Sequence, residues 1–316
     1  MQINKNSFVQ HNRLSILQFS TDGKNSFDYI SGTEAIKSGL VKVTEISESG
    51  SVNNLIVDNP LDKYLFFSDG DILIGAKQNR VINVSMLLKP NSKTNIPVSC
   101  IERGRWRHST FSFSPSEYYV PHSVRAGKHR SLDMNLRMHK TFYANQARVW
   151  GDVDSYSERI DHFSPTGDLE SGLKSSRESY DEYLRHFKSD EEANGMAIFF
   201  DDKIVSIDVF NRDDIYKIYF PRLIQSAASE TFYLKEKQFD LNEEIAKEKT
   251  YRLFSKLDEQ QYVVENSPGA GVLKSFCDDR ISGFMLAYEH HLIHLAILNL
   301  LNGENNRFQR FREFRP

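Results

Sequence analysis

The sequence predicts an α+β protein with a β-rich N-terminal sandwich or open barrel, followed by an α+β domain with an antiparallel sheet. Two observations support this fold class. Short apolar runs separated by turn residues follow one another between residues 41 and 113, and helical periodicity begins only after residue 131. Because a chain of 316 residues can bury two cores, we expect domains at residues 1–120 and 121–316.

The predicted first domain begins with residues 1–30, which are polar and irregular apart from an apolar run at residues 14–19. Residues 32–39 are expected to form a short helix that Thr33 caps and Gly39 ends. Six apolar runs then alternate with turn clusters, and we interpret them as strands at residues 41–46, 55–57, 64–67, 72–74, 81–88 and 96–101.

The predicted second domain follows a loop rich in Ser, Pro and His at residues 114–131. Apolar spacings of three and four indicate a helix from Leu132 to about Arg159, and a second helix after a Ser/Gly-rich linker at residues 163–176. The remaining pattern predicts a hairpin, two helices and a three-stranded end, at residues 195–210, 213–229, 242–256 and 261–300 respectively.

Composition limits the classes of function. With a formal net charge of −3, the chain lacks the overall basic excess of a protein that coats DNA. Its two cysteines, Cys100 and Cys277, exclude a disulfide scaffold and fit a reducing compartment. No apolar run reaches the ~18 residues of a membrane helix, and the N-terminus lacks the apolar core of a signal peptide. We therefore expect a cytoplasmic protein that does not contact a membrane.

The first candidate site is the run from Cys100 to His108. In an extended strand, Glu102 and Trp106 would share one face and Arg103 and Arg105 the other. Guanidinium groups held by a carboxylate bind phosphate or carboxylate through paired hydrogen bonds, and an indole ring offers a stacking face. The alternative is a salt-bridged strand at a domain contact with Trp106 in the core, and the residues leave both interpretations open.

A second candidate is the triplet of Gln78, Asn79 and Arg80 between two apolar strands. Three consecutive long polar side chains are costly at such a place unless they are exposed or paired. They would line the same pocket as Glu102 if the strands are neighbours. The alternative is a polar turn, which is also our interpretation of Asp69 and Asp71.

Several other residues point less clearly to chemistry. Cys100 would need a lowered pKa and a base to act as a nucleophile, whereas a buried structural cysteine is commoner. The histidines at 290, 291 and 294 lack the partner Glu pattern of zinc enzymes, so we predict no metal site and expect core or pocket histidines. Gly269-Ala270-Gly271 lacks the following helix and Lys of a phosphate loop, and Asp208 on an apolar strand is either functional or paired.

Two basic regions suggest contact with nucleic acid. Between Arg103 and Lys140 the chain has eight Lys or Arg residues against the acids Glu117 and Asp133. The tail at residues 306–315 alternates Arg with Phe. The alternative for the tail, which we prefer, is an arm that docks on its own protein or on a partner subunit.

These segments resemble the ARG-and-Rhodanese-Phosphatase-superfamily-associated protein domain, in which the first abbreviation denotes ADP-ribosylglycohydrolases. The resemblance rests on GAKQNR at residues 75–80 and PVSCIERGRW at 97–106, with AIKSGLVKVTE at 35–45 and LIVDN at 55–59. It continues more weakly through QARVW at 146–150, residues 195–210 and 223–226, and His294. The family pattern is similar at the site residues Gln78, Arg80, Cys100, Glu102, Arg105 and Trp106.

The resemblance implies no established reaction. It links the chain, by gene neighbourhood, to proteins that handle ADP-ribose and NAD and to bacterial conflict systems. We therefore expect a protein that binds, and in a stronger form hydrolyses, a phosphorylated nucleoside such as ADP-ribose or NAD. The alternative is a non-enzymatic component of a bacterial defence system that contacts nucleic acid, a partner protein or a second copy of itself.

In this hypothesis the site residues have separate tasks. Arg80, Arg103 or Arg105 would bind phosphate, and Trp106 or Trp150 would stack on the base. Glu102 and Gln78 are the predicted catalytic residues, which would orient water or a ribose hydroxyl. Asn79 and Gln146 complete the expected ligand-binding set, and the sequence identifies no cofactor.

Overall fold

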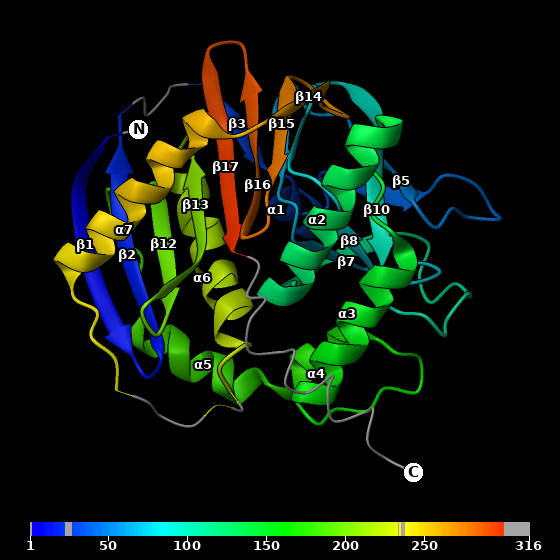
Figure 1. The fold of residues 1–316 in the computed structure, drawn as a ribbon. Helices are drawn as coiled ribbons and strands as arrows, with labels where there is room; N and C mark the ends of the chain where they lie inside the picture. Colours follow the sequence, from blue (N-terminus) through cyan, green and yellow to red (C-terminus); the bar gives the residue numbers. More distant parts are fainter. Residues whose placement is uncertain (1, 23–26, 233, 235–237, 300–316) are drawn as a thin grey trace.

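The structure is a computed structural model that describes residues 2–22, 27–232, 234 and 238–299. Its largest sheet has eight strands in the order β1-β2-β12-β13-β17-β16-β15-β14 (Figure 1). These strands are β1 (Ile3–His11), β2 (Leu14–Thr21), β12 (Gly195–Phe200), β13 (Lys203–Phe210), β14 (Val263–Asn266), β15 (Val272–Cys277), β16 (Ile281–Tyr288) and β17 (His291–Asn299).

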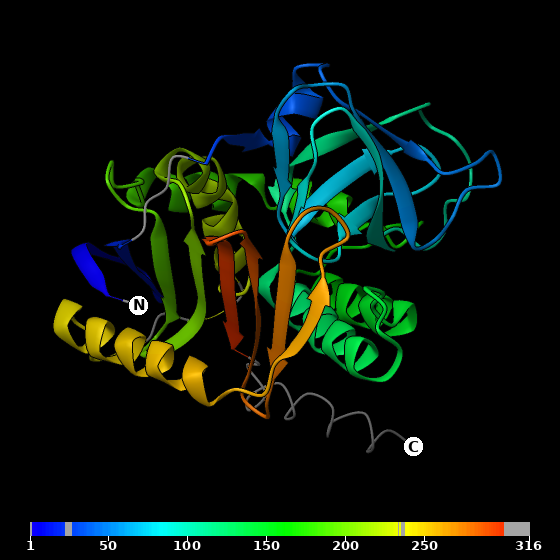
Figure 2. The same cartoon turned by 90° about the horizontal axis from the view of Figure 1, so that it is seen from above.

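A second β region lies beside this sheet (Figure 2). It contains a six-stranded sheet, β11-β7-β8-β10-β5-β4, and a three-stranded sheet, β3-β6-β9. β3 and β6 are parallel, and the other described strand pairs are antiparallel. The bounds are β3 (Tyr29–Ser31), β4 (Lys42–Glu45), β5 (Asn54–Asn59), β6 (Tyr64–Phe67), β7 (Asp71–Gly75), β8 (Arg80–Ile82), β9 (Met86–Leu88), β10 (Ser92–Cys100) and β11 (Phe113–Tyr119).

The helices pack around both β regions, which confirms the predicted α+β class. They are α1 (Gly32–Lys37), α2 (His122–His139), α3 (Gln146–Arg159), α4 (Leu169–Ser175), α5 (Arg177–His186), α6 (Asp213–Ala228) and α7 (Glu243–Ser255). Figure 2 shows α6 and α7 on opposite faces of the eight-stranded sheet. Strand β2 is therefore buried along its whole length: Leu14 and Ile16 belong to the main core, and Phe19 packs against Phe254 of α7.

Two predictions at the N-terminus are wrong. Residues 1–30 are not irregular, because β1 and β2 form a hairpin that pairs with β12 of the eight-stranded sheet. The polar residues of β1 gave no strand pattern, because β1 is the edge strand of the sheet and exposes much of one side. The cap of α1 is Ser31, whose Oγ accepts a hydrogen bond from Glu34 N, and not Thr33; Gly39 follows the helix with φ of 73°, as expected.

Four further predictions are wrong, three in the middle of the chain and one in its C-terminal region. The expected loop at residues 114–131 is β11 and the first half of α2, and the expected linker at 163–176 contains α4. The single helix predicted from Leu132 to Arg159 is two helices, because Lys140 adopts a left-handed conformation with φ of 55° that ends α2. The C-terminal region forms four strands, β14 to β17, where three were predicted.

The domain boundary near residue 120 stays a prediction. Strand pairing adds a feature that the prediction lacked, since the first hairpin of the chain belongs to the sheet built by its second half. A further contact joins the regions at the β14–β15 turn, where Ala270 N donates to Leu87 O at 2.6 Å. The Gly269-Ala270-Gly271 segment therefore packs against the backbone of β9. A Cβ on Gly269 would lie 2.2 Å from Leu87 O, so the contact requires glycine there.

Candidate functional site

The two most distinctive sequence segments lie side by side. Strand β10 pairs with β8 so that Cys100 faces Arg80, and Ile101 N donates to Asn79 O at 3.1 Å. The condition for a site shared by Gln78-Asn79-Arg80 and Glu102, neighbouring strands, is therefore met, and the shared pocket itself stays a prediction. The extended conformation predicted for Cys100–His108 is wrong, because β10 ends at Cys100 and the following residues form an irregular loop. Glu102 and Trp106 therefore do not share one face of a strand that has Arg103 and Arg105 on its other face.

Arg105 holds this loop in place. Its Nε and Nη2 donate to the two oxygens of Glu102 at 2.8 and 2.7 Å, which is the bidentate arrangement of a strong ion pair. Its Nη1 donates to Ala76 O at 2.6 Å and to Ser109 Oγ at 3.0 Å. Since protein groups already occupy these donors, the structure gives Arg105 a structural task in the conformation described.

Glu102 and Asn79 extend the same network. Glu102 also accepts hydrogen bonds from Asn79 N at 3.1 Å and Thr166 Oγ1 at 3.2 Å. Asn79 Nδ2 donates to Asp168 Oδ1 at 2.9 Å, and burial raises the pKa of Asp168. Sequence reasoning missed Asp168, although its place as the N-cap of α4 is a recognisable signal.

Arg80 is fully buried and incompletely bonded, unlike Arg105. Its Nη1 donates to Gln78 Oε1 at 3.1 Å, Nη2 lies 3.4 Å from Ser51 O, and the nearest carboxylate oxygen, Glu45 Oε1, is 3.8 Å away. Arg80 Nε has no hydrogen-bond partner in the part of the chain that the structure describes. Burial lowers the pKa of Arg80, so an additional anion would stabilise its charged form.

Cys100 lies next to Arg80 as a buried thiol. Its Sγ is 3.0 Å from Gln78 Oε1 and 3.7 Å from Val52 O. Burial raises the pKa of Cys100 to about 11, so the thiol is protonated at neutral pH. A protonated thiol is a poor nucleophile, and this environment favours the structural interpretation of Cys100.

Residues 46–53 cover this cluster. Their contacts with it are few: Ser51 O approaches Arg80, Val52 O approaches Cys100, and Glu48 O accepts a hydrogen bond from Lys77 Nζ. We call residues 46–53 the cover loop. Its sequence, Ile-Ser-Glu-Ser-Gly-Ser-Val-Asn, is rich in small polar residues.

Trp106 borders the cluster on its outer side. The indole is 47% exposed, with Lys77 Nζ 5.4 Å and Arg80 Cζ 5.7 Å from a ring centroid. These distances fit cation–π contacts. The alternative that placed Trp106 in the core is wrong, since almost half of the side chain is open to solvent.

A family model matches almost the whole chain. The model of the ARG and Rhodanese-Phosphatase-superfamily-associated Protein domain, ARPP-1, matches residues 2–298. The chain belongs to this family. No curated protein and no solved structure matches it. The matched range includes every predicted site residue, and no described helix of the ARPP-1 domain is long and apolar enough to cross a membrane.

The remaining predicted ligand residues of the ARPP-1 domain lie around α3. Gln146 clamps the backbone of Cys100, accepting from its N at 2.9 Å and donating to its O at 2.8 Å. Arg103 lies over the ring of Trp150, 5.2 Å from the centroid, and pairs with Asp154 at 2.5 Å. Arg103 is half exposed, and it is the guanidinium of the predicted set that is most open to solvent.

A second buried charge cluster was missed by sequence reasoning. Arg125 of α2 donates to both oxygens of Asp69, at 2.9 and 2.8 Å, and to both oxygens of Asp208, at 3.2 and 2.7 Å. All three side chains are at most 1% exposed. Asp69 lies in the expected turn but is not a surface residue, and Asp208 is the paired carboxylate that one alternative described.

Lys128 and His294 complete this cluster. Lys128 Nζ donates to three backbone oxygens, of Asp69, Ile82 and Asn83, and burial lowers the pKa of Lys128 to about 7. His294 Nδ1 is 2.9 Å from Ser85 Oγ, and its Nε2 is 3.3 Å from Asp208 Oδ1.

The order Ser85, His294, Asp208 resembles a hydrolase triad. All three residues are 0% exposed, however, and His294 stacks on Phe210 at 4.4 Å. We therefore assign the group to the core, as expected for His294. The described residues contain no group of three or more His, Cys, Asp or Glu suited to a metal ion.

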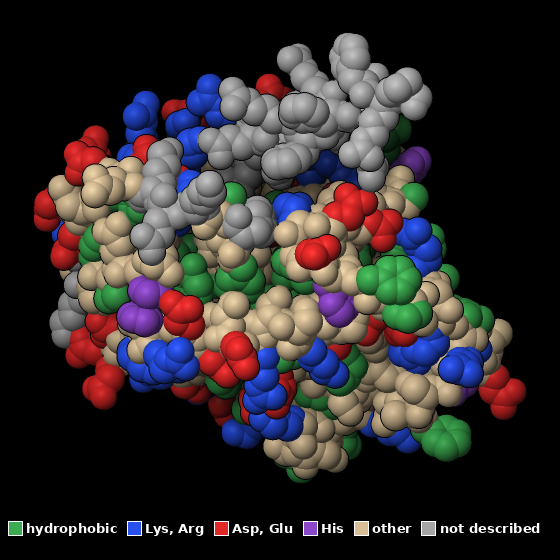
Figure 3. All heavy atoms as spheres, turned by 90° about the horizontal axis from the view of Figure 1, so that it is seen from below, with side chains coloured by type: hydrophobic (Ala, Val, Ile, Leu, Met, Phe, Trp, Pro, Cys, Tyr) green, Lys and Arg blue, Asp and Glu red, His purple; other side chains and the backbone are tan. Residues whose placement is uncertain are grey.

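Burial also changes the interpretation of the basic region. Arg125 and Lys128, two of its eight cations, are inside the protein and unavailable to nucleic acid. On the face drawn in Figure 3, Lys and Arg side chains are interspersed with Asp and Glu in the part not covered by grey atoms. The Arg/Phe tail at residues 306–315 lies outside the described residues.

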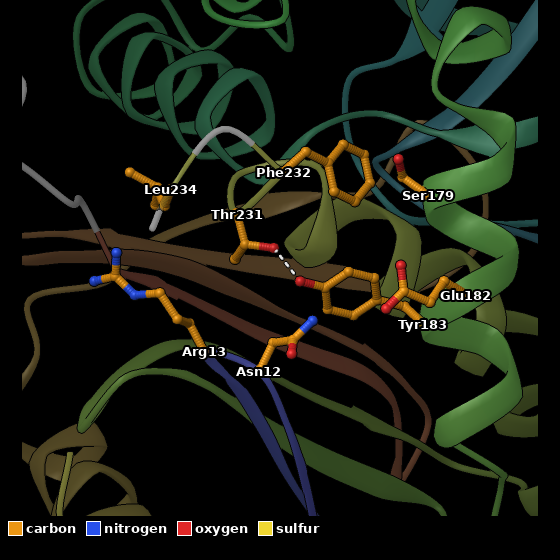
Figure 4. A pocket seen from close by; sticks show the side chains of 8 residues that line it. All are labelled: Asn12, Arg13, Ser179, Glu182, Tyr183, Thr231, Phe232 and Leu234. Carbon is orange, nitrogen blue, oxygen red and sulfur yellow. Dashed lines mark hydrogen bonds between the residues drawn. The ribbon is translucent and has the colours of Figure 1, made fainter. Parts of the chain in front are cut away.

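The ARPP-1 domain has a cavity of about 230 Å³ far from these segments in the sequence (Figure 4). It is lined by the β1–β2 turn, by α5 and by the segment after α6, including Asn12, Glu182 and Phe232. Tyr183 and Thr231 are hydrogen-bonded to each other at 2.8 Å across it. None of its lining residues belongs to the predicted site.

Proposed function

We propose that this ARPP-1 domain binds a phosphorylated nucleoside beneath the cover loop. The observation that carries the proposal is Arg80, which is 0% exposed and has no partner for Nε among the residues that the structure describes. A buried charge with an unused donor is costly, and a phosphate oxygen would satisfy it. Arginine is suited to this task because its planar guanidinium matches the geometry of phosphate.

The surroundings of Arg80 fit the rest of such a ligand. Lys77, Arg80 and Arg105 supply three positive charges against the two carboxylates of Glu45 and Glu102, so this group favours an anion. The half-exposed ring of Trp106 offers a stacking face for a base beside those cations. The family's association with ARG proteins supports ADP-ribose or NAD as the first ligands to test.

Binding requires that the cover loop move. Few contacts hold residues 46–53 to the cluster, and Ser47, Glu48 and Ser49 are exposed. Segments with few buried contacts open at low cost, and such loops commonly close over a bound ligand.

Binding is better supported than hydrolysis. Glu102 accepts four hydrogen bonds from protein donors, and Gln78 Oε1 accepts from both Arg80 and Cys100. Neither predicted catalytic residue presents an unused oxygen to a water molecule. Hydrolysis of ADP-ribose or NAD stays a prediction, which product analysis after incubation with the protein would check.

The test is thermal unfolding with ADP-ribose, NAD, ATP, GTP and cyclic dinucleotides. A ligand at about 100 times its dissociation constant stabilises the folded state by about 2.7 kcal/mol, which raises Tm by several degrees. We expect a shift with at least one ligand that is lost in Arg80→Gln and retained in Arg107→Gln, since Arg107 is exposed. No shift with any ligand, or an equal shift in Arg80→Gln, would contradict the proposal.

A further inference from the structure

We infer that Glu45 makes the site selective for ribonucleotides, by accepting hydrogen bonds from the hydroxyl groups of the ribose. This inference rests on the proposed function and identifies the sugar of the ligand. Glu45 was quoted in the family resemblance, but no task was predicted for it.

The carboxylate of Glu45 is buried, and one of its two oxygens accepts a hydrogen bond. It ends β4 and its side chain is 4% exposed. Oε1 is held by Lys77 N at 3.4 Å and lies 3.8 Å from Arg80 Nη2. Oε2 is buried and finds no hydrogen-bond partner within the described ranges. A buried carboxylate oxygen in this state is stabilised by any donor that reaches it, and a hydroxyl group is such a donor.

Gly50 of the cover loop lies next to Glu45 Oε2 and adds no side chain there. Its φ is 77°, a conformation that favours glycine, and a Cβ there would lie 3.3 Å from Glu45 Oε2. The same position would be 3.5 Å from Trp106 Cζ2 and 3.0 Å from Lys77 Cδ. The cover loop therefore approaches the carboxylate, the indole and the lysine through a residue without a side chain.

The side chains around Glu45 suit the other two parts of a nucleotide. Glu45 lies next to Arg80 and Lys77, whose positive charges suit phosphate. Both cations lie over the ring of Trp106, which suits a base, and Gly50 approaches Glu45 and Trp106 together. The sugar joins base to phosphate, so the carboxylate faces the part of the ligand that carries hydroxyl donors. An acidic residue that binds the ribose 2′-hydroxyl is the solution used in dinucleotide-binding folds. A phosphate on that hydroxyl would be repelled by the same carboxylate.

The experiment compares ADP and GDP with their 2′-deoxy forms by isothermal titration calorimetry. We expect the wild-type protein to bind the ribonucleotides at least about tenfold more tightly, since a hydrogen bond to a charged acceptor is worth about that factor or more. In Glu45→Gln the preference should fall below about threefold, while affinity for the deoxy forms changes little. Glu117→Gln is the control and should keep the sugar preference, because it removes an exposed carboxylate outside the cover loop.

Each outcome has one meaning. Equal affinity of the wild-type protein for both sugars would overturn the inference and leave the proposed function standing. Binding of none of the four probes by the folded wild-type protein would overturn the inference, and the proposed function would fall with it only if the ligands of the thermal unfolding test also leave Tm unchanged. Should Glu45→Gln unfold, Glu45→Asp keeps the counter-charge of Arg80 and withdraws the oxygens by one methylene group. It should then lose the sugar preference while remaining folded.

Discussion

Two buried arginines, Arg125 and Arg80, lie in two polar clusters of this protein. The guanidinium of Arg125 is fully hydrogen-bonded to carboxylates, whereas that of Arg80 is not. Arg125 makes four hydrogen bonds to Asp69 and Asp208, the longest of them 3.2 Å. Arg80 makes two hydrogen bonds, to Gln78 Oε1 at 3.1 Å and to Ser51 O at 3.4 Å, and its carboxylate neighbour Glu45 is 3.8 Å away. Both guanidiniums are at most 1% exposed, so burial alone does not distinguish them.

Their pKa values change in opposite directions. Burial opposes ionisation at both sites, but at Arg125 the two carboxylates overcome it and raise the pKa, whereas at Arg80 burial prevails and lowers it. A fully paired buried charge belongs to the fold, and an underpaired one is completed by something that binds. Substitutions that separate stability from binding test this distinction.

The largest effect is expected at Arg125. Arg125→Met leaves Asp69 and Asp208 buried without their cation, which should lower the free energy of unfolding by about 3–5 kcal/mol. Chemical denaturation at pH 7 measures this loss. Arg130→Met, on the same helix but only partly buried, is the control and should cost less than about 1 kcal/mol. A loss at Arg125 no larger than at Arg130 would contradict the structural assignment.

A smaller effect is expected at Asp152, a second incompletely bonded group. Its Oδ2 is buried against Gly127 of α2 and has no hydrogen-bond partner in the described part of the chain. Burial raises the pKa of Asp152 to about 6. Because the folded pKa exceeds the unfolded one, the stability contributed by the protonated acid is complete below pH 3.8 and is lost as pH rises through 6.

Asp152→Asn should therefore stabilise the protein at pH 7.5 by about 2 kcal/mol, allowing for partial exposure, and change nothing below about pH 4. The difference in unfolding free energy between variant and wild type, measured from pH 4 to 8, isolates this group. Asp181→Asn, at an exposed helical position, is the control. A pH-independent difference would show that Asp152 does not titrate as described.

At Arg80 we expect less loss of stability than at Arg125 and more loss of binding. Arg80→Met removes the hydrogen bonds to Gln78 and Ser51 and leaves Glu45 without its distant cation, for which about 1–2 kcal/mol is expected. Denaturation of the unliganded variant, measured beside Arg125→Met, compares the two sites directly. A loss as large as that at Arg125 would mean that Arg80 also belongs to the fold.

The sequence predicted many of the strands and helices because a regular element has a local signature. The apolar runs at residues 81–88 and 96–101 indicated strands at β8 and β10, although the first run divides into β8 and β9 of two different sheets. The pairing of β8 with β10, which brings Gln78-Asn79-Arg80 next to Glu102, is seen only in the structure. The hairpin of β12 and β13 and helices α5, α6 and α7 were predicted for the same reason. Local periodicity is enough where each element buries one continuous face.

What the sequence could not predict depends on tertiary pairing. Arg125 and Lys128 suggested a solvated loop, because a cation buried by Asp69 and Asp208 looks like a surface cation until its partners are known. Arg105 suggested a ligand clamp, and its backbone acceptor Ala76 O became visible only with the folded loop. Glu45 belongs to the family pattern, but nothing in the sequence indicates that its Oε2 lacks a hydrogen-bond partner among the described residues.

The smallest effect on stability is expected at Trp106, where binding and folding separate most completely. Trp106→Leu removes a ring that is 47% exposed, so the unfolding free energy should change by less than about 1 kcal/mol. Nucleotide affinity should fall by about tenfold, because stacking of one base on an aromatic ring contributes about 1–3 kcal/mol. Calorimetric titration with the ligand found for the wild-type protein measures this loss.

Trp150→Leu is the matched control for that substitution. Trp150 also lies beneath a guanidinium, that of Arg103, but this guanidinium is already paired with Asp154. Its loss should leave nucleotide affinity unchanged. If affinity instead falls in Trp150→Leu and not in Trp106→Leu, the ligand lies against α3, and the unpaired Nε of Arg80 has a different explanation.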